Sequence, residues 1–143
     1  RNYSGVSGTA SQLYKAGIDA SMEFLGVDPG TFSGDEQSLF DALPDDEAKL
    51  ERIIYQKWIG LFPDAHEAWA EQRRTGYPVI VKRTGADFEQ GITNGTIPNR
   101  IPYPAGELNT NATQVNIARE RQGGDGMLVK LWWDKKTLQD SWE

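Results

Sequence analysis

The chain has 143 residues, the length of one domain or of one part of a larger domain. Acidic residues outnumber basic ones 21 to 15, and the net charge of −6 argues against nucleic acid or an anionic membrane surface as the main partner, because no basic excess is present to neutralise phosphates. With no cysteine and only one histidine, His66, the composition excludes disulfides and thiol nucleophiles and argues against zinc sites and histidine-based triads.

The first predicted element is a helix over Thr9–Leu25. Its apolar side chains recur at three- and four-residue steps, which places them on one face. Thr9 and Gln12 have the spacing of a capping box, and Gly26 is a typical stop.

Three further segments lead to the middle of the chain. A loop is predicted over Asp28–Gly34, followed by one or two helical turns over Glu36–Leu43. A second helix is predicted from Pro44 to Phe62, because proline suits the first helical position and acidic residues follow it. A third helix is predicted over Asp64–Thr75, ending at Gly76.

The second half has a different character. The sequence predicts a short strand or an extended segment over Tyr77–Val81, and a long ordered loop or a pair of short strands over Thr84–Gly106. One more helix is predicted over Leu108–Arg119, and an extended apolar segment over Met127–Trp133. The expected fold class is therefore mainly α, with long irregular loops and a few short strands.

The sequence contains no convincing catalytic or cofactor constellation. Its carboxylates fall in first helical turns or on polar faces, and its glycine-rich pieces lack the lysine and threonine or serine of a phosphate loop. We therefore predict no catalytic residue, no cofactor and no metal site, although a weak calcium site in the loop 28–36 stays open. The five tryptophans are notable, because an exposed aromatic face can stack on a sugar ring.

Several short segments, in this order and spacing, resemble the C-terminal part of the SusD/RagB family. They are Ala16–Met22, Ile54–Ile59, Glu67–Trp69 with Arg73–Pro78, Ile97–Pro104 with Glu107 and Asn111, and Lys130–Asp134. Members of that family are surface lipoproteins of Bacteroidetes-type bacteria that bind nutrients, mainly glycans.

The resemblance implies tetratricopeptide-like helix pairs and no catalysis. It also implies an outer-membrane, cell-surface location, an oligosaccharide ligand and a TonB-dependent (SusC-like) transporter as partner. Since family members are several times longer, residues 1–143 are expected to be the C-terminal portion of such a domain, with 1–76 helical and 77–143 rich in loops. The lipid anchor, the only expected link to a membrane, would lie outside this chain.

The resemblance divides the notable side chains into two groups. Those expected to be structural are Trp58, Trp69, Arg74, Gly76, Pro78, Arg100, Pro104, Glu107, Asn111, Trp132 and Trp133. Those expected to be exposed for ligand or partner contact are Tyr77, Phe88, Tyr103 and Trp142. Two alternatives to glycan capture remain, namely a helical interaction module without sugar binding and a fragment of a glycoside hydrolase.

Overall fold

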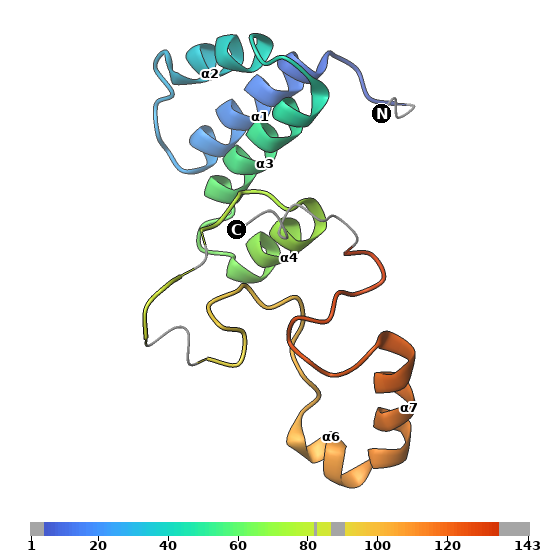
Figure 1. Cartoon of the computed structure of the whole chain (residues 1–143). Helices are drawn as coiled ribbons and strands as arrows, with labels where there is room; N and C mark the ends of the chain where they lie inside the picture. Colours follow the sequence, from blue (N-terminus) through green and yellow to red (C-terminus); the bar gives the residue numbers. More distant parts are fainter. Residues whose placement is uncertain (1–4, 82, 87–90, 135–143) are drawn as a thin grey trace. The chain divides into compact units, whose positions relative to one another are not determined.

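The structure, a computed structural model, describes residues 5–81, 83–86 and 91–134 (Figure 1). Within these ranges it contains six helices and no strand, so the predicted mainly helical class is confirmed. The chain divides into two compact units, Arg1–Ala68 and Trp69–Glu143. Among the described helices, none has both the length and the apolar character needed to cross a bilayer.

Helix α1 (Ala10–Phe24) begins and ends as its sequence predicts. The Thr9 hydroxyl accepts from the Gln12 backbone N–H at 3.2 Å, and the Gln12 side chain accepts from the Thr9 N–H at 2.8 Å. This capping box satisfies two backbone donors that the first turn leaves without partners. The chain turns away at Gly26, which has a φ of +68°.

Helix α2 (Phe32–Asp41) starts earlier than predicted, inside the expected loop 28–34. The loop is only a tight turn, in which the Asp28 carboxylate accepts from the Gly30 N–H at 2.9 Å. The Thr31 hydroxyl then donates to Asp35 at 2.9 Å across the first helical turn. These local bonds bring Ser33 and Gly34 into the helix.

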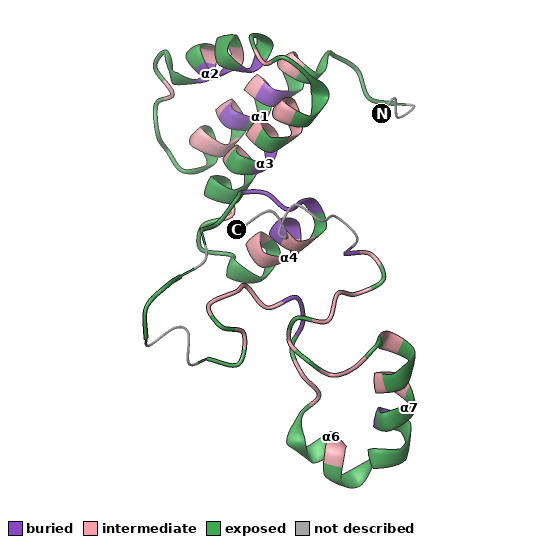
Figure 2. Ribbon diagram, viewed as in Figure 1, coloured by how far each residue is buried: buried purple, intermediate pink, exposed green. Residues whose placement is uncertain are grey.

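Helix α3 (Asp46–Gly60) completes the core of the first unit. Helix α1 contacts both α2 and α3, and the buried side chains of the cluster are Tyr14, Ile18 and Phe40. The Tyr14 and Phe40 rings stack with centroids 4.6 Å apart. The purple stretches on these helices in Figure 2 are short, which shows how small this core is.

Helix α4 (Ala65–Thr75) ends at Gly76, as predicted. Gly76 has a φ of +79°, and its N–H donates to the Gln72 carbonyl at 2.7 Å. The Tyr77 N–H then donates to the Thr75 hydroxyl at 3.1 Å. Because that amide is used locally and Pro78 has no N–H, no strand forms over Tyr77–Val81, and the first of the two predicted alternatives is wrong.

The single helix predicted over Leu108–Arg119 is two helices, α6 (Ala105–Thr110) and α7 (Ala112–Gln122). Asn111 separates them with a φ of −132° and a ψ of 33°, which interrupts the helical path. Helix α7 ends at Gly123 with a φ of +85° and buries Val115. The segment Met127–Trp133, which was expected to be extended, is irregular chain with turns at 127–128 and 132–133.

Candidate functional site

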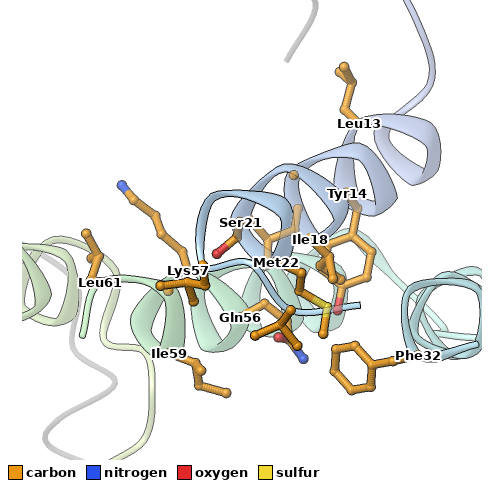
Figure 3. A pocket seen from close by; sticks show the side chains of 15 residues that line it. Leu13, Tyr14, Ile18, Ser21, Met22, Phe32, Gln56, Lys57, Ile59 and Leu61 are labelled. Atoms are coloured by element: carbon orange, nitrogen blue, oxygen red, sulfur yellow. The ribbon is translucent and has the colours of Figure 1, made fainter. Parts of the chain in front are cut away.

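An open groove of about 640 Å³ lies between α1, α3 and the loop that leads into α2 (Figure 3). Its walls are mostly apolar, and they include Leu13, Ile18, Met22, Phe32, Ile53 and Ile59. The polar side chains at its edge are those of Ser21, Gln56 and Lys57. The described residues that line this groove include no carboxylate, so they fit an apolar surface better than an acid–base pair.

A partly buried ionic network beside this groove connects α1, α2 and α3. The Tyr14 hydroxyl donates to Glu36 Oε2 at 2.8 Å, and Arg52 donates to both carboxylate oxygens, from Nε at 2.9 Å and from Nη2 at 2.5 Å. Burial and the hydrogen bond to Glu36 raise the pKa of Tyr14 to about 12.

The same network fixes the charge of Glu36. Burial raises the pKa of this carboxyl, but the hydrogen bonds from Arg52 and Tyr14 outweigh burial, so its pKa lies below the usual value. A general acid needs a raised pKa, and Glu36 has the opposite shift. The network therefore serves to join three helices.

In the second unit, Arg73 lies against two tryptophans. Its guanidinium carbon is 3.6 Å from the centroid of the Trp69 ring and 5.0 Å from that of Trp133. Arg73 Nη1 also donates to the Asn99 carbonyl at 2.7 Å, and Trp69 Nε1 donates to the Pro98 carbonyl at 2.7 Å. Burial lowers the pKa of Arg73, and the nearby charge of Asp134 opposes that effect. This cluster anchors the loop at Pro98–Asn99 to α4.

A second ion pair fixes the loop that leads into α6. Arg100 is buried, and its Nη1 donates to Asp125 Oδ1 at 2.8 Å and to the Gly124 carbonyl at 3.3 Å. Asp125 also accepts from the Tyr103 N–H at 3.2 Å, and the Arg100 guanidinium lies 4.9 Å from the centroid of the Tyr103 ring. Charge-assisted bonds of this kind hold Arg100, Tyr103 and the turn after α7 in one arrangement.

A second groove, of about 650 Å³, lies beside α7. It is lined by residues of α7 and of the segment 130–132, among them Gln114, Ile117, Arg121, Gln122, Lys130 and Trp132. Trp132 is 83% exposed. This groove combines an open aromatic side chain with several hydrogen-bond donors, which is the composition that binding of a polar ring requires.

The four side chains predicted to contact a ligand or partner do not share one environment. The expectation that Tyr77 is exposed is wrong, because it is 5% exposed and lies in the buried turn after α4. Tyr103 is half-buried against Arg100. Phe88 and Trp142 lie outside the described residues. Neither Tyr77 nor Tyr103 lines either of the grooves described above.

The tryptophans expected to pack behave differently from one another. Trp69 and Trp133 are half-buried and contact Arg73. Trp58 is 39% exposed and Trp132 is 83% exposed, so the expectation that these two are packed in a core is wrong in this structure. The two adjacent rings of Trp132 and Trp133 therefore differ in environment. Trp133 contacts Arg73, whereas Trp132 is exposed.

The remaining residues expected to be structural also fall into two groups. Gly76, Pro78 and Arg100 are buried. Arg74 is exposed and pairs with Glu71 at 2.6 Å. Pro104, Glu107 and Asn111 are exposed too, and the Asn111 amide donates to the Glu107 carboxylate at 3.3 Å on the surface, so this pair does not satisfy buried groups as expected.

Sequence reasoning missed the Glu36 network and the α7 groove. The sequence predicts one or two helical turns over Glu36–Leu43, and no neighbouring residue indicates that the Glu36 side chain is buried. The α7 groove joins residues of a polar helix with an exposed tryptophan, a combination that periodicity does not reveal. Within the described ranges, no group of three or more histidine, aspartate or glutamate side chains is placed to hold a metal ion.

Comparison with known proteins identifies the class to which this fold belongs. A family model described as SusD-like, SusD and RagB outer membrane lipoprotein, matches residues 33–134. The chain therefore belongs to the SusD-like family, and the predicted location at the outer membrane is confirmed at the level of that family. No curated protein matches the chain.

Solved structures of the same family superpose on most of the chain. A SusD homologue from Bacteroides uniformis is 31% identical, with a TM-score of 0.75 over 90% of this chain and 32% of its own. A chitin-binding SusD homologue from Flavobacterium johnsoniae is 30% identical, with a TM-score of 0.78 over 93% of this chain and 33% of its own. A third structure, of a chitin-binding protein, is 34% identical, with a TM-score of 0.72 over 92% of this chain and 29% of its own. The chain thus spans about a third of the length of these relatives.

Proposed function

We propose that this chain is part of a non-catalytic protein that captures glycans or other nutrients at the bacterial surface and delivers them to a TonB-dependent outer-membrane transporter. The observation that carries the proposal is the family match over residues 33–134, together with the superposition on a chitin-binding SusD homologue at a TM-score of 0.78. Residues 1–143 would form the C-terminal portion of the SusD-like domain, as the order of the motifs indicates.

The pairing of two buried glutamates with arginines supports binding without catalysis. Glu36 is paired with Arg52, and Glu71 is paired with Arg74 at 2.6 Å. Glycoside hydrolysis needs one carboxyl that stays protonated near neutral pH and a second carboxyl across the sugar. The hydrogen bonds from Arg52 and Tyr14 hold the pKa of Glu36 below its usual value, so Glu36 does not fit the role of the acid.

Glycan retention combined with product analysis tests the proposal. The protein that carries this chain should bind at least one oligosaccharide on a glycan array, and mass spectrometry should recover that oligosaccharide unchanged after prolonged incubation. It should also co-purify with a TonB-dependent transporter from its own outer membrane. Release of shorter sugars, or absence of binding to every glycan, would contradict the proposal.

A helical interaction module is the second candidate, and the apolar groove between α1 and α3 favours it. Leu13, Phe32 and Ile59 are each between 43% and 49% exposed there, and such a surface suits another protein segment better than a sugar. Co-purification with a transporter together with no binding on a glycan array would support this candidate over glycan capture.

A further inference from the structure

The loop between α4 and α6 contains a pair of residues with a specific chemical reactivity. Asn94 precedes Gly95, and no other asparagine in the sequence is followed by glycine. The carbonyl carbon of an asparagine side chain can be attacked by the backbone nitrogen of the next residue, which closes a five-membered succinimide ring. Such a reaction within one molecule is favoured because the two groups are already held close together. A side chain on the next residue hinders the approach, and glycine has none.

The structure places this pair in an exposed turn. Asn94 has a φ of +49° and Gly95 a φ of +76°, values typical of a type I′ turn, and the Thr96 N–H donates to the Thr93 carbonyl at 3.0 Å. Asn94 is exposed, so water reaches its side chain. The hydrogen bond that closes the turn uses the nitrogen of Thr96, whereas the attacking nitrogen would be that of Gly95. Ring closure therefore does not require the donor that holds the turn.

The turn can rearrange into the geometry that ring closure needs. The backbone at Asn94 has to rotate until the Gly95 nitrogen lies against the side-chain carbonyl carbon. The Asn94 N–H donates to the Gly91 carbonyl at 2.9 Å, a bond within the same short segment. Exposed turns closed by local bonds open on timescales far shorter than those of slow covalent chemistry. The folded state therefore leaves the pair free to react.

Two other positions each meet one of the two requirements. Asn111 is also exposed, but alanine follows it, and the methyl group hinders the attacking nitrogen. Asp125 is followed by glycine, but its carboxylate accepts from Arg100 Nη1 at 2.8 Å, which holds the side chain in place. Asn94 combines an exposed side chain with a following glycine.

We propose that Asn94 is a site of spontaneous deamidation, in which the Gly95 nitrogen displaces ammonia from the side chain and water opens the ring that results. The Gly95 nitrogen forms a bond to Asn94 Cγ as its proton passes through solvent to the leaving group, and the Cγ–Nδ2 bond breaks to release ammonia. Water, the co-reactant, then adds to one of the two ring carbonyls. Addition at the side-chain carbonyl gives aspartate, and addition at the backbone carbonyl gives isoaspartate.

The modification changes the charge and the path of the chain at the turn. Either product adds one negative charge to a chain whose net charge is −6, and isoaspartate also lengthens the backbone by one methylene group. The segment that follows the turn is anchored separately, because Trp69 Nε1 donates to the Pro98 carbonyl at 2.7 Å. We therefore expect the modified protein to retain its helix content in circular dichroism.

Peptide mapping by mass spectrometry tests the proposal on the protein that carries this chain. Samples are kept in a mildly alkaline buffer, because the attacking nitrogen has to lose its proton, and are withdrawn over time. Digestion with pepsin in acid then avoids conversion during preparation. Fragmentation spectra locate each converted residue and distinguish aspartate from isoaspartate. We expect both products at Asn94, formed at least about tenfold faster than at Asn111.

A substitution at Gly95 and a matched control isolate the role of the following residue. Gly95→Ala should slow conversion of Asn94 by about tenfold, because the added methyl group hinders ring closure. Gly91→Ala adds the same methyl group to the same loop at a position that does not follow an asparagine, so the rate should stay within about twofold. Circular dichroism and thermal melting establish that both variants are folded.

A synthetic peptide of residues 91–97 in the same buffer gives the rate without the fold. A rate at Asn94 in the folded protein below about a tenth of the peptide rate would overturn the inference that the fold leaves this site reactive. Equal rates at Asn94 and Asn111, an unchanged rate in folded Gly95→Ala, or aspartate without isoaspartate would overturn it as well. These results are independent of glycan capture, which the array tests separately.

Discussion

The carboxylate of Glu36 is the one acceptor shared by Tyr14 of α1 and Arg52 of α3, so one side chain of α2 joins three helices. Glu36→Gln keeps the shape but removes the charge. We expect it to lower the free energy of unfolding by about 1–3 kcal/mol, because Arg52 and the Tyr14 hydroxyl lose a charged partner. Urea unfolding followed by circular dichroism measures the change. Glu51→Gln, at an exposed position of α3, is the matched control and should stay within about 0.5 kcal/mol.

The lowered pKa of Glu36 also fixes the direction of a pH effect. The folded state binds the proton less tightly than the unfolded state, whose pKa is near 4.5. The stabilisation is therefore fully present above that value and is lost as pH falls through the lower folded pKa. The difference in unfolding free energy between the wild type and Glu36→Gln should be constant near neutral pH and shrink below about pH 4.5. A difference that persists undiminished in strong acid would contradict the assignment.

Arg73 and Arg74 are neighbours in the sequence with different surroundings. Arg73 lies against Trp69 and Trp133 and donates to Asn99, whereas Arg74 is exposed. Arg73→Lys keeps the charge and loses the planar stacking, so we expect a loss of about 1–3 kcal/mol and a change in tryptophan fluorescence. Arg74→Lys should change neither quantity appreciably. Equal effects of the two substitutions would show that the stacking of Arg73 is not what stabilises the second unit.

At the scale of helices and loops, the sequence predicts features that depend on residues a few positions apart, such as helix ends. It does not predict features that depend on distant segments, such as strand pairing. The ends of α1 and α4 follow from Thr9, Gln12 and the glycines that come after each helix, because caps depend on residues a few positions apart. The strand expected over Tyr77–Val81 needed a partner that the described chain does not provide. The break at Asn111 was missed because apolar residues on both sides keep a helical spacing across it.

The cap of α3 offers a test at this scale. Asp45 is the N-cap, and its carboxylate accepts from the Ala48 N–H at 2.8 Å, whereas Asp46 is the first helical residue. Both carry one negative charge near the helix N-terminus, but only Asp45 satisfies a backbone donor. Asp45→Ala should therefore lower the free energy of unfolding by about 1 kcal/mol, and Asp46→Ala by a few tenths, roughly the dipole contribution alone. Thermal or urea unfolding distinguishes the two, and equal losses would show that the cap contributes nothing beyond charge.

For the whole molecule, the sequence predicts the mainly helical class and, through the order of its motifs, the family. It does not predict which individual side chains are buried. The expected scaffold tryptophans illustrate the limit, since Trp133 contacts Arg73 while its neighbour Trp132 is open. Which of two adjacent rings is covered depends on the path of distant loops such as Pro98–Arg100, and no local pattern encodes that path. The same reasoning explains why Tyr77 was expected at the surface and is buried.

We expect the exposed apolar groove of the first unit to be the main binding site for a hydrophobic dye. Phe32 lines the groove and is 43% exposed, whereas Phe24 is 89% exposed and does not line it. If a concave apolar surface binds the fluorescent dye 8-anilinonaphthalene-1-sulfonate, Phe32→Asn should lower the dye signal by about half, because the groove loses one wall. Phe24→Asn removes more exposed aromatic surface but should leave the signal nearly unchanged. A larger effect from Phe24 than from Phe32 would mean that scattered apolar surface, and not the groove, binds the dye.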